Sequence, residues 1–105
     1  MKIEGNTIIF KSFLWNYELE KSGKKPCTVR VIPNDERDDY MEFTIEYEHR
    51  GGNSRDKRIR IVKVDDSTEF FERDITHIEQ IGSVLYSELT LICWRHEDDG
   101  GDVEN

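Results

Sequence analysis

Four residues on a turn and the strand after it carry the functional groups best suited to binding chemistry in this sequence: Lys24, Lys25, Thr28 and Arg30. A predicted helix ends just before them, at Gly23, and the strand presents Thr28 and Arg30 on one face because strand side chains alternate. An ammonium, a hydroxyl and a guanidinium then converge at one pocket mouth, which suits an anionic or oxygen-rich ligand. A basic turn after a helix also complements the helix dipole, but that role does not explain the alternating Thr28 and Arg30.

Segment 50–63 is the second basic region. It holds six basic residues against a single acid: Arg50, Arg55, Lys57, Arg58, Arg60 and Lys63. One interpretation is a basic ribbon that contacts a nucleic-acid backbone. The other is a charge ladder, in which an antiparallel hairpin sets Arg58 and Arg60 across from Glu46 and Glu48. Arg50, Arg55 and Lys57 lie at the predicted loop, are freer than the two ladder arginines, and are expected to contact a ligand.

The net charge of −8, from 15 basic and 23 acidic residues, argues against a generic basic nucleic-acid binder. Five of the acids lie in residues 97–105, which we expect to form a disordered acidic tail. Without them the body, residues 1–96, has 18 acids against 15 bases, a charge of −3, and is expected to be one domain. The acidic surface also suits docking on a basic protein partner.

The cysteines, histidines and N-terminal residues set further expectations. No apolar run approaches the roughly 18 residues of a membrane span, and residues 1–6 do not resemble a signal peptide, so we expect a cytoplasmic protein. Cys27 and Cys93 are then expected to be reduced, buried thiols, with a reactive Cys27 near the lysine pair as the alternative. His49, His77 and His96 lack metal-ligand spacing, so neither a metal nor a cofactor is expected.

Hydrophobic periodicity predicts five to seven strands and one early helix, with Ser12 at its N-cap and Gly23 after its C-terminus. The predicted strands are 7–10, 27–32, 40–49, 58–64, 68–73, 74–79 and 84–94, where 68–79 is alternatively one strand with an irregularity and Gly82-Ser83 forms the turn before the last. We expect an α+β, mostly β fold: a small barrel-like sheet with the helix covering one end. Trp15, Tyr17 and Trp94 fall within these elements, so core packing is favoured over base stacking.

The run Ser-Gly-Lys-Lys-x-x-Thr-Val-Arg, after a strand and a helix, resembles the opening of ASCH-domain proteins, relatives of the PUA-like β-barrels. Their Gly-x-Lys-x-x-Thr-x-Arg motif is matched by Gly23, Lys25, Thr28 and Arg30. Segment 71–78 and a closing strand that ends in a tryptophan are also similar to short ASCH-like proteins of bacteria and phages. The resemblance implies a small PUA/ASCH-like β-barrel with a pocket for RNA or a modified nucleoside or nucleotide.

Some small ASCH proteins are amidohydrolases that remove the acetyl group from acetylated cytidine. By that resemblance Thr28 would attack the amide carbonyl, Lys25 would activate it as a base, and a glutamate would handle the leaving amine. Glu72 and Glu79 are the candidates, and Glu79 completes the predicted catalytic set. The sequence therefore leaves three hypotheses: binding of RNA or a nucleotide, amide hydrolysis, and protein interaction through the acidic surface.

Overall fold

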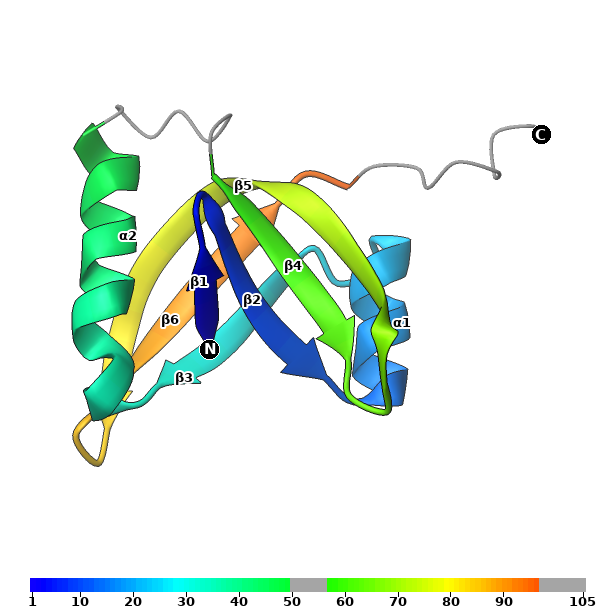
Figure 1. The fold of residues 1–105 in the computed structure, drawn as a ribbon, viewed down its shortest axis with the longest axis horizontal. Coiled ribbons are helices and arrows are strands. Elements are labelled where there is room, and N and C mark those ends of the chain that lie inside the picture. The colour runs from blue at the N-terminus through cyan, green and yellow to red at the C-terminus, as the bar shows by residue number, and fades with distance from the viewer. Residues whose placement is uncertain (50–56, 97–105) are drawn as a thin grey trace.

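The computed structural model describes residues 1–49 and 57–96, which form a mostly β structure with two helices (Figure 1). The elements in chain order are β1 (Lys2–Glu4), β2 (Thr7–Ser12), α1 (Leu14–Ser22), β3 (Cys27–Ile32), the short 3-10 helix η1 (Asn34–Glu36), α2 (Arg37–His49), β4 (Arg58–Lys63), β5 (Asp66–Val84) and β6 (Ser87–Trp94). The α+β, mostly β prediction is confirmed. The expectation of one early helix is corrected, because α2 follows β3.

The six described strands form one mixed sheet in the order β1-β2-β4-β5-β6-β3, with β2 and β4 parallel and the other pairs antiparallel. The 19-residue β5 pairs with β4 along its first half and with β6 along its second. Register shifts interrupt its pairing with β6, and such irregularities bend a strand. In Figure 1, β5 arches over the molecule and turns the two halves of the sheet toward each other.

The sheet is not closed into a barrel, which corrects the barrel expectation. Closure would require β3 to hydrogen-bond with β1, but these two strands are the edges of the sheet. The core lies between the two halves and contains six fully buried isoleucines: Ile8, Ile32, Ile59, Ile61, Ile75 and Ile92. Phe71 adds ring contacts with Tyr17 and Trp94, at centroid distances of 5.4 and 6.2 Å. Burial of one such side chain stabilises the fold by roughly 1.5–3 kcal/mol.

Segment 40–49 is helical, so the prediction of a strand there is wrong. Its alternating pattern mimics a strand, but the buried residues Tyr40 and Phe43 have the three-residue spacing of a helix face. The acidic residues Asp38 and Asp39 in the first turn of α2 favour a helix start, since they complement the helix dipole. The helix start signal and the three-residue spacing of the buried side chains therefore describe this segment better than its two-residue alternation does.

The predicted hairpin between 40–49 and 58–64 is therefore also wrong. Arg58 and Arg60 form their charge ladder with the neighbouring strand β5, opposite Asp74 and Glu72. Arg58 pairs with Asp74, and Arg60 Nη2 lies 2.6 Å from Glu72 Oε2. Of the three loop cations that we expected to contact a ligand, Arg50 and Arg55 lie outside the described residues, as does the tail 97–105. The third, Lys57, is only 3% exposed, and its Nζ lies 4.5 Å from the ring centre of Phe43, which corrects the expectation of a free loop cation.

The remaining elements agree closely with the sequence prediction. Helix α1 ends at Gly23, whose φ of 88° is the left-handed conformation of a C-cap. Phe13 rather than Ser12 is the N-cap. The Ser12 hydroxyl donates to the Glu20 carboxylate and does not cap the helix. Segment 68–79 is part of one long strand, as the second alternative predicted. The last turn lies at Leu85 and Tyr86, both at positive φ, and not at Gly82-Ser83.

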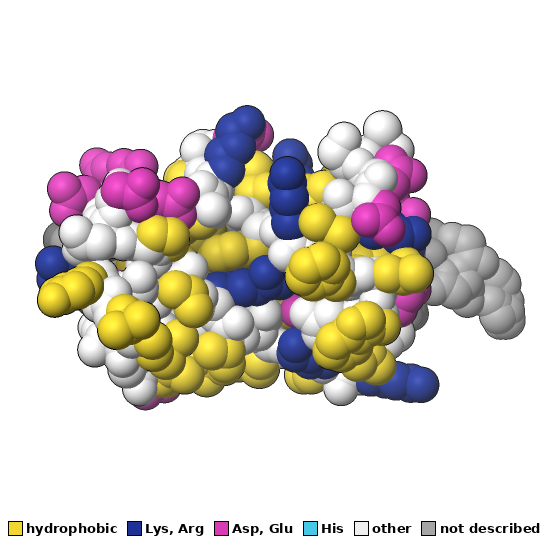
Figure 2. Space-filling view, turned by 90° about the horizontal axis from the view of Figure 1, so that it is seen from below, with side chains coloured by type: hydrophobic (Ala, Val, Ile, Leu, Met, Phe, Trp, Pro, Cys, Tyr) yellow, Lys and Arg dark blue, Asp and Glu magenta, His cyan; other side chains and the backbone are white. Residues whose placement is uncertain are grey.

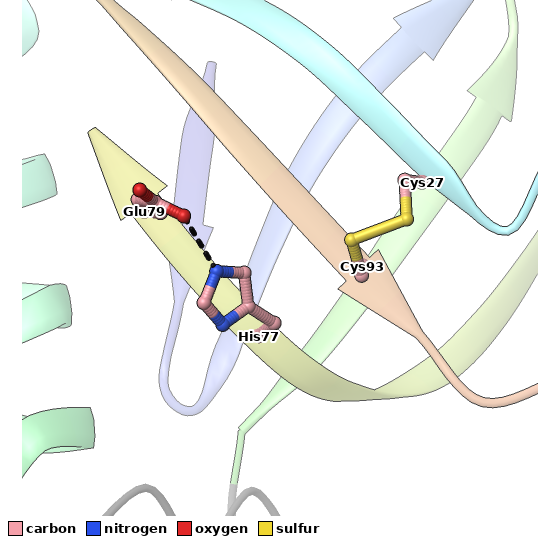
Figure 3. The surroundings of a disulfide bond; sticks show 4 residues. All are labelled: Cys27, His77, Glu79 and Cys93. Atoms are coloured by element: carbon pink, nitrogen blue, oxygen red, sulfur yellow. Dashed lines mark hydrogen bonds and ion pairs between the residues drawn. A yellow bond between two sulfur atoms is a disulfide. The ribbon is translucent and has the colours of Figure 1, made fainter. Parts of the chain in front are cut away.

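Cys27 and Cys93 form a disulfide, which corrects the prediction of two reduced thiols (Figure 3). The two residues lie opposite each other in the β3–β6 register, with a Cα–Cα distance of 4.0 Å. The adjacent Trp94 N donates to Pro26 O, so the cysteines occupy a pair without mutual backbone hydrogen bonds, where side chains approach most closely. The 66-residue separation in sequence hides this adjacency.

Reduction of the disulfide should lower the free energy of unfolding by about 2–4 kcal/mol, because the bond closes a loop of 66 residues in the unfolded chain. Urea unfolding with and without a phosphine reductant measures the difference. The double variant Cys27→Ser/Cys93→Ser is the control, and its unfolding should not respond to the reductant. Two titratable thiols in the untreated wild-type protein would contradict the prediction.

Candidate functional site

A buried carboxylate, that of Glu20 on α1, is the centre of the polar cluster at the open edge of the sheet. Its side chain is 0% exposed. Ser12 Oγ donates to Oε1 at 2.7 Å, and Asn16 Nδ2 donates to Oε2 at 3.3 Å. Two cations face Oε2: Arg30 Nη2 at 3.6 Å and Lys25 Nζ at 3.8 Å. A buried charge needs such partners, because burial without them costs several kcal/mol.

Arg30 connects β3 to β2 across the gap between them. Its Nη1 donates to the main-chain oxygen of Lys11 at 2.7 Å, and its Nη2 donates to Ser12 Oγ. The Nε donates to Thr28 Oγ1 at 2.9 Å, and the guanidinium carbon lies 5.1 Å from the ring centre of Phe10. Burial lowers the pKa of Arg30, while the charge of Glu20 acts in the opposite direction. The side chain is thus held as a fixed cation between two strands.

The structure brings together three of the four residues of the predicted binding set. Thr28 and Arg30 share a hydrogen bond, and Lys25 joins them through Glu20 and through Asn16 Oδ1, to which Lys25 Nζ donates at 2.7 Å. Lys24 lies on the turn with an exposed side chain. Thr28 and Arg30 thus lie together as strand alternation predicts, but of the four residues only Arg30 lines the cleft described below.

Glu79 lies away from this cluster. The register puts Thr28 in one row with Ile92 and Ile78, so Glu79, the next residue of β5, projects to the other face of the sheet. There its carboxylate contacts His77 Nε2 at 2.9 Å (Figure 3). The carboxylate near Lys25 is that of Glu20, at ion-pair rather than hydrogen-bond distance.

A cleft of about 580 Å³ opens beside Arg30, between β3 and the strands β1 and β2. Its described lining residues are Met1, Lys2, Ile9, Phe10, Lys11, Arg30 and Val31. Three of them are cations and none is a carboxylate. Figure 2 looks at the molecule from this side and shows basic side chains in and around a hollow. The cleft combines positive charge with an apolar wall, which suits a ligand that is both anionic and aromatic.

Sequence reasoning missed two members of this site, Glu20 and Lys11. Glu20 follows the buried Tyr17 by three residues and so lies on the core-facing side of α1. A charged residue on that side was a signal that a buried cation would accompany it. No sequence pattern marked Lys11 as a site residue, because its place beside the cleft depends on which strands form the edge of the sheet.

No protein-family model, no curated protein and no solved structure matches this chain. In the part that the structure describes, no group of three or more metal-ligating side chains could hold a metal ion. Neither described helix is long and apolar enough to cross a membrane.

Replacing Arg30 should destabilise the fold strongly. Arg30→Met leaves the buried Glu20 carboxylate with Lys25, 3.8 Å away, for charge compensation, and we expect a loss of about 3 kcal/mol in urea unfolding. The double variant Glu20→Leu/Arg30→Met should be more stable than Arg30→Met, because it removes the uncompensated charge as well.

Arg37→Met is the matched control, since the side chain of Arg37 is 51% exposed in its ion pair with Glu88, and its loss should cost less than about 1 kcal/mol. If Glu20→Leu costs as much in the Arg30→Met protein as in the wild type, the two charges are not coupled.

Proposed function

We propose that this protein binds RNA or a nucleoside or nucleotide in the cleft beside Arg30. The observation that carries the proposal is the lining of the cleft, in which Lys2, Lys11 and Arg30 occur together with the apolar residues Ile9, Phe10 and Val31, without a carboxylate among the described lining residues. A phosphate is attracted by the cations, and a planar base fits against the apolar wall. We propose the cytoplasm as the compartment in which such a ligand is met, and there the Cys27–Cys93 disulfide would be exposed to reducing thiols.

Each cation has a distinct role in this proposal. Lys11 is exposed, so its ammonium is free to move toward a phosphate. Lys2 has the same mobility but shares its charge with Glu4 at 3.0 Å. Arg30 is fixed by its contacts, and Glu20 offsets one of the two positive charges that Arg30 and Lys25 contribute. The cluster therefore retains one net positive charge at the end of the cleft.

We place binding ahead of amide hydrolysis because of the state of Thr28. Its side chain is only 2% exposed, and its oxygen accepts a hydrogen bond from the Arg30 cation. A nucleophilic hydroxyl needs a base within hydrogen-bond reach, and the described contacts of Lys25 Nζ are with Asn16 and Glu20. The motif shared with ASCH-domain proteins supports the same location for the ligand, and we propose that the chain is an open-edged member of the PUA/ASCH-like class.

The charge reversal Lys11→Glu tests the proposal. Uridine monophosphate should bind the wild-type protein, and the variant should bind it at least about tenfold more weakly, because a hydrogen bond to a charged group contributes roughly 1.5–3 kcal/mol. Isothermal titration calorimetry measures both affinities.

Arg37→Gln serves as the control for loss of a positive charge away from the cleft and should leave the affinity unchanged within about twofold. Equal binding by Lys11→Glu and the wild-type protein would reject the cleft as the site.

A further inference from the structure

Three consecutive hydrophobic residues at the start of α1 are exposed. Phe13, Leu14 and Trp15 retain 69%, 49% and 71% of their accessible surface. The sequence favoured core packing for Trp15, and its exposure corrects that prediction. Isolated exposed leucines are common, but two aromatic side chains close in sequence and mostly in solvent form an apolar patch of the kind found at binding surfaces.

This aromatic pair lies beside the basic residues of the proposed site. Lys11, which lines the cleft, precedes Phe13 by two residues. At the other end, Asn16 follows Trp15 and accepts the hydrogen bond from Lys25 Nζ. In Figure 2, hydrophobic side chains stand next to basic ones at the α1 end of the hollow. Along the chain, Phe13 and Trp15 therefore lie between Lys11, which lines the cleft, and Asn16, which binds Lys25.

We infer that the binding surface continues from the cleft over Phe13 and Trp15, and that its ligand is a single-stranded nucleic acid whose bases stack on these two rings. Cations spaced along an exposed aromatic surface are the arrangement that such a strand requires, because phosphates and base faces alternate along it. In a duplex the base faces are already stacked on one another. The inference rests on the function proposed for the cleft and names the ligand class of that site.

Charge favours a nucleic acid over a protein as the occupant of this surface. Segment 11–30 has five basic residues against two acidic ones, Glu18 and Glu20, and Glu20 is fully buried. An apolar protein partner would gain from the aromatic rings but not from the surrounding cations. A polyanion with aromatic faces gains from both.

Trp15 provides both the variant and the signal for the test. The chain has two tryptophans, and Trp94 is 3% exposed, so fluorescence quenching by a ligand reports on Trp15. Hexauridylate should quench the wild-type fluorescence. Trp15→Ala should bind a fluorescein-labelled hexauridylate at least about tenfold more weakly, whereas Trp15→Phe, which keeps a ring, should lose less than about threefold.

Two controls separate this inference from the function on which it rests. Uridine monophosphate, which the proposed function places in the cleft, should bind Trp15→Ala and the wild type equally, because Trp15 is not among the described lining residues. Leu19→Ala removes another exposed apolar side chain from α1 and should leave hexauridylate binding unchanged. Circular dichroism establishes that each variant is folded.

The outcomes are distinguishable. If the wild type binds uridine monophosphate but Trp15→Ala binds hexauridylate as tightly as the wild type does, the stacking surface is rejected and the proposed function stands. Tighter binding of an RNA duplex than of hexauridylate also overturns the inference. If neither uridine monophosphate nor hexauridylate binds the wild type, the inference and the proposed function both fail.

Discussion

The buried ion pair between Glu20 and Arg30 is the interaction on which the arrangement of the site depends. It joins α1 to the edge strand β3, and Arg30 adds hydrogen bonds to β2. A carboxylate without solvent must keep its cation nearby, since the unpaired charge would cost several kcal/mol. This requirement keeps β3 close to β2, although the two strands are not hydrogen-bonded neighbours in the sheet. In a closed barrel, backbone hydrogen bonds would join the two ends of the sheet. Here the side chain of Arg30 joins β3 to β2 instead.

The open edge has a direct consequence for the proposed function. If β3 were hydrogen-bonded to the other edge of the sheet, backbone groups would fill the space that the cleft occupies. The bend of β5 brings the two edges near each other, and the contacts of Arg30 keep them at side-chain distance. The hollow in Figure 2 is the result, with Lys11 on one side and Arg30 between the strands. The same residue that stabilises the fold therefore also defines the end of the proposed binding site.

The sequence predicts local features well and nonlocal pairings poorly. Gly23 marks the end of α1, and strand alternation places Thr28 beside Arg30, because both depend on neighbours within a few residues. The Cys27–Cys93 disulfide and the partner of Lys25 depend on strand order, which periodicity does not encode. Segment 40–49 shows the limit of periodicity itself, since one pattern fits a strand by alternation and a helix by the spacing of its buried residues.

Distance and ionic screening weaken the repulsion between remote carboxylates and a phosphate at the cleft. A chain with a net charge of −8 is therefore compatible with the proposed polyanionic ligand. The acidic first turn of α2 and the basic surface around α1 lie at opposite ends of the molecule in Figure 1. β3, with six residues, runs from one end to the other and spans about 20 Å. This separation exceeds two screening lengths, which are about 8 Å each at physiological ionic strength. At the α1 end of the cleft, a phosphate would therefore interact with Lys11 and Arg30 more strongly than with the carboxylates of α2. At the other end, Met1 N is ion-paired with Glu36 at 3.2 Å and Lys2 with Glu4 at 3.0 Å, so the positive charge there is already compensated.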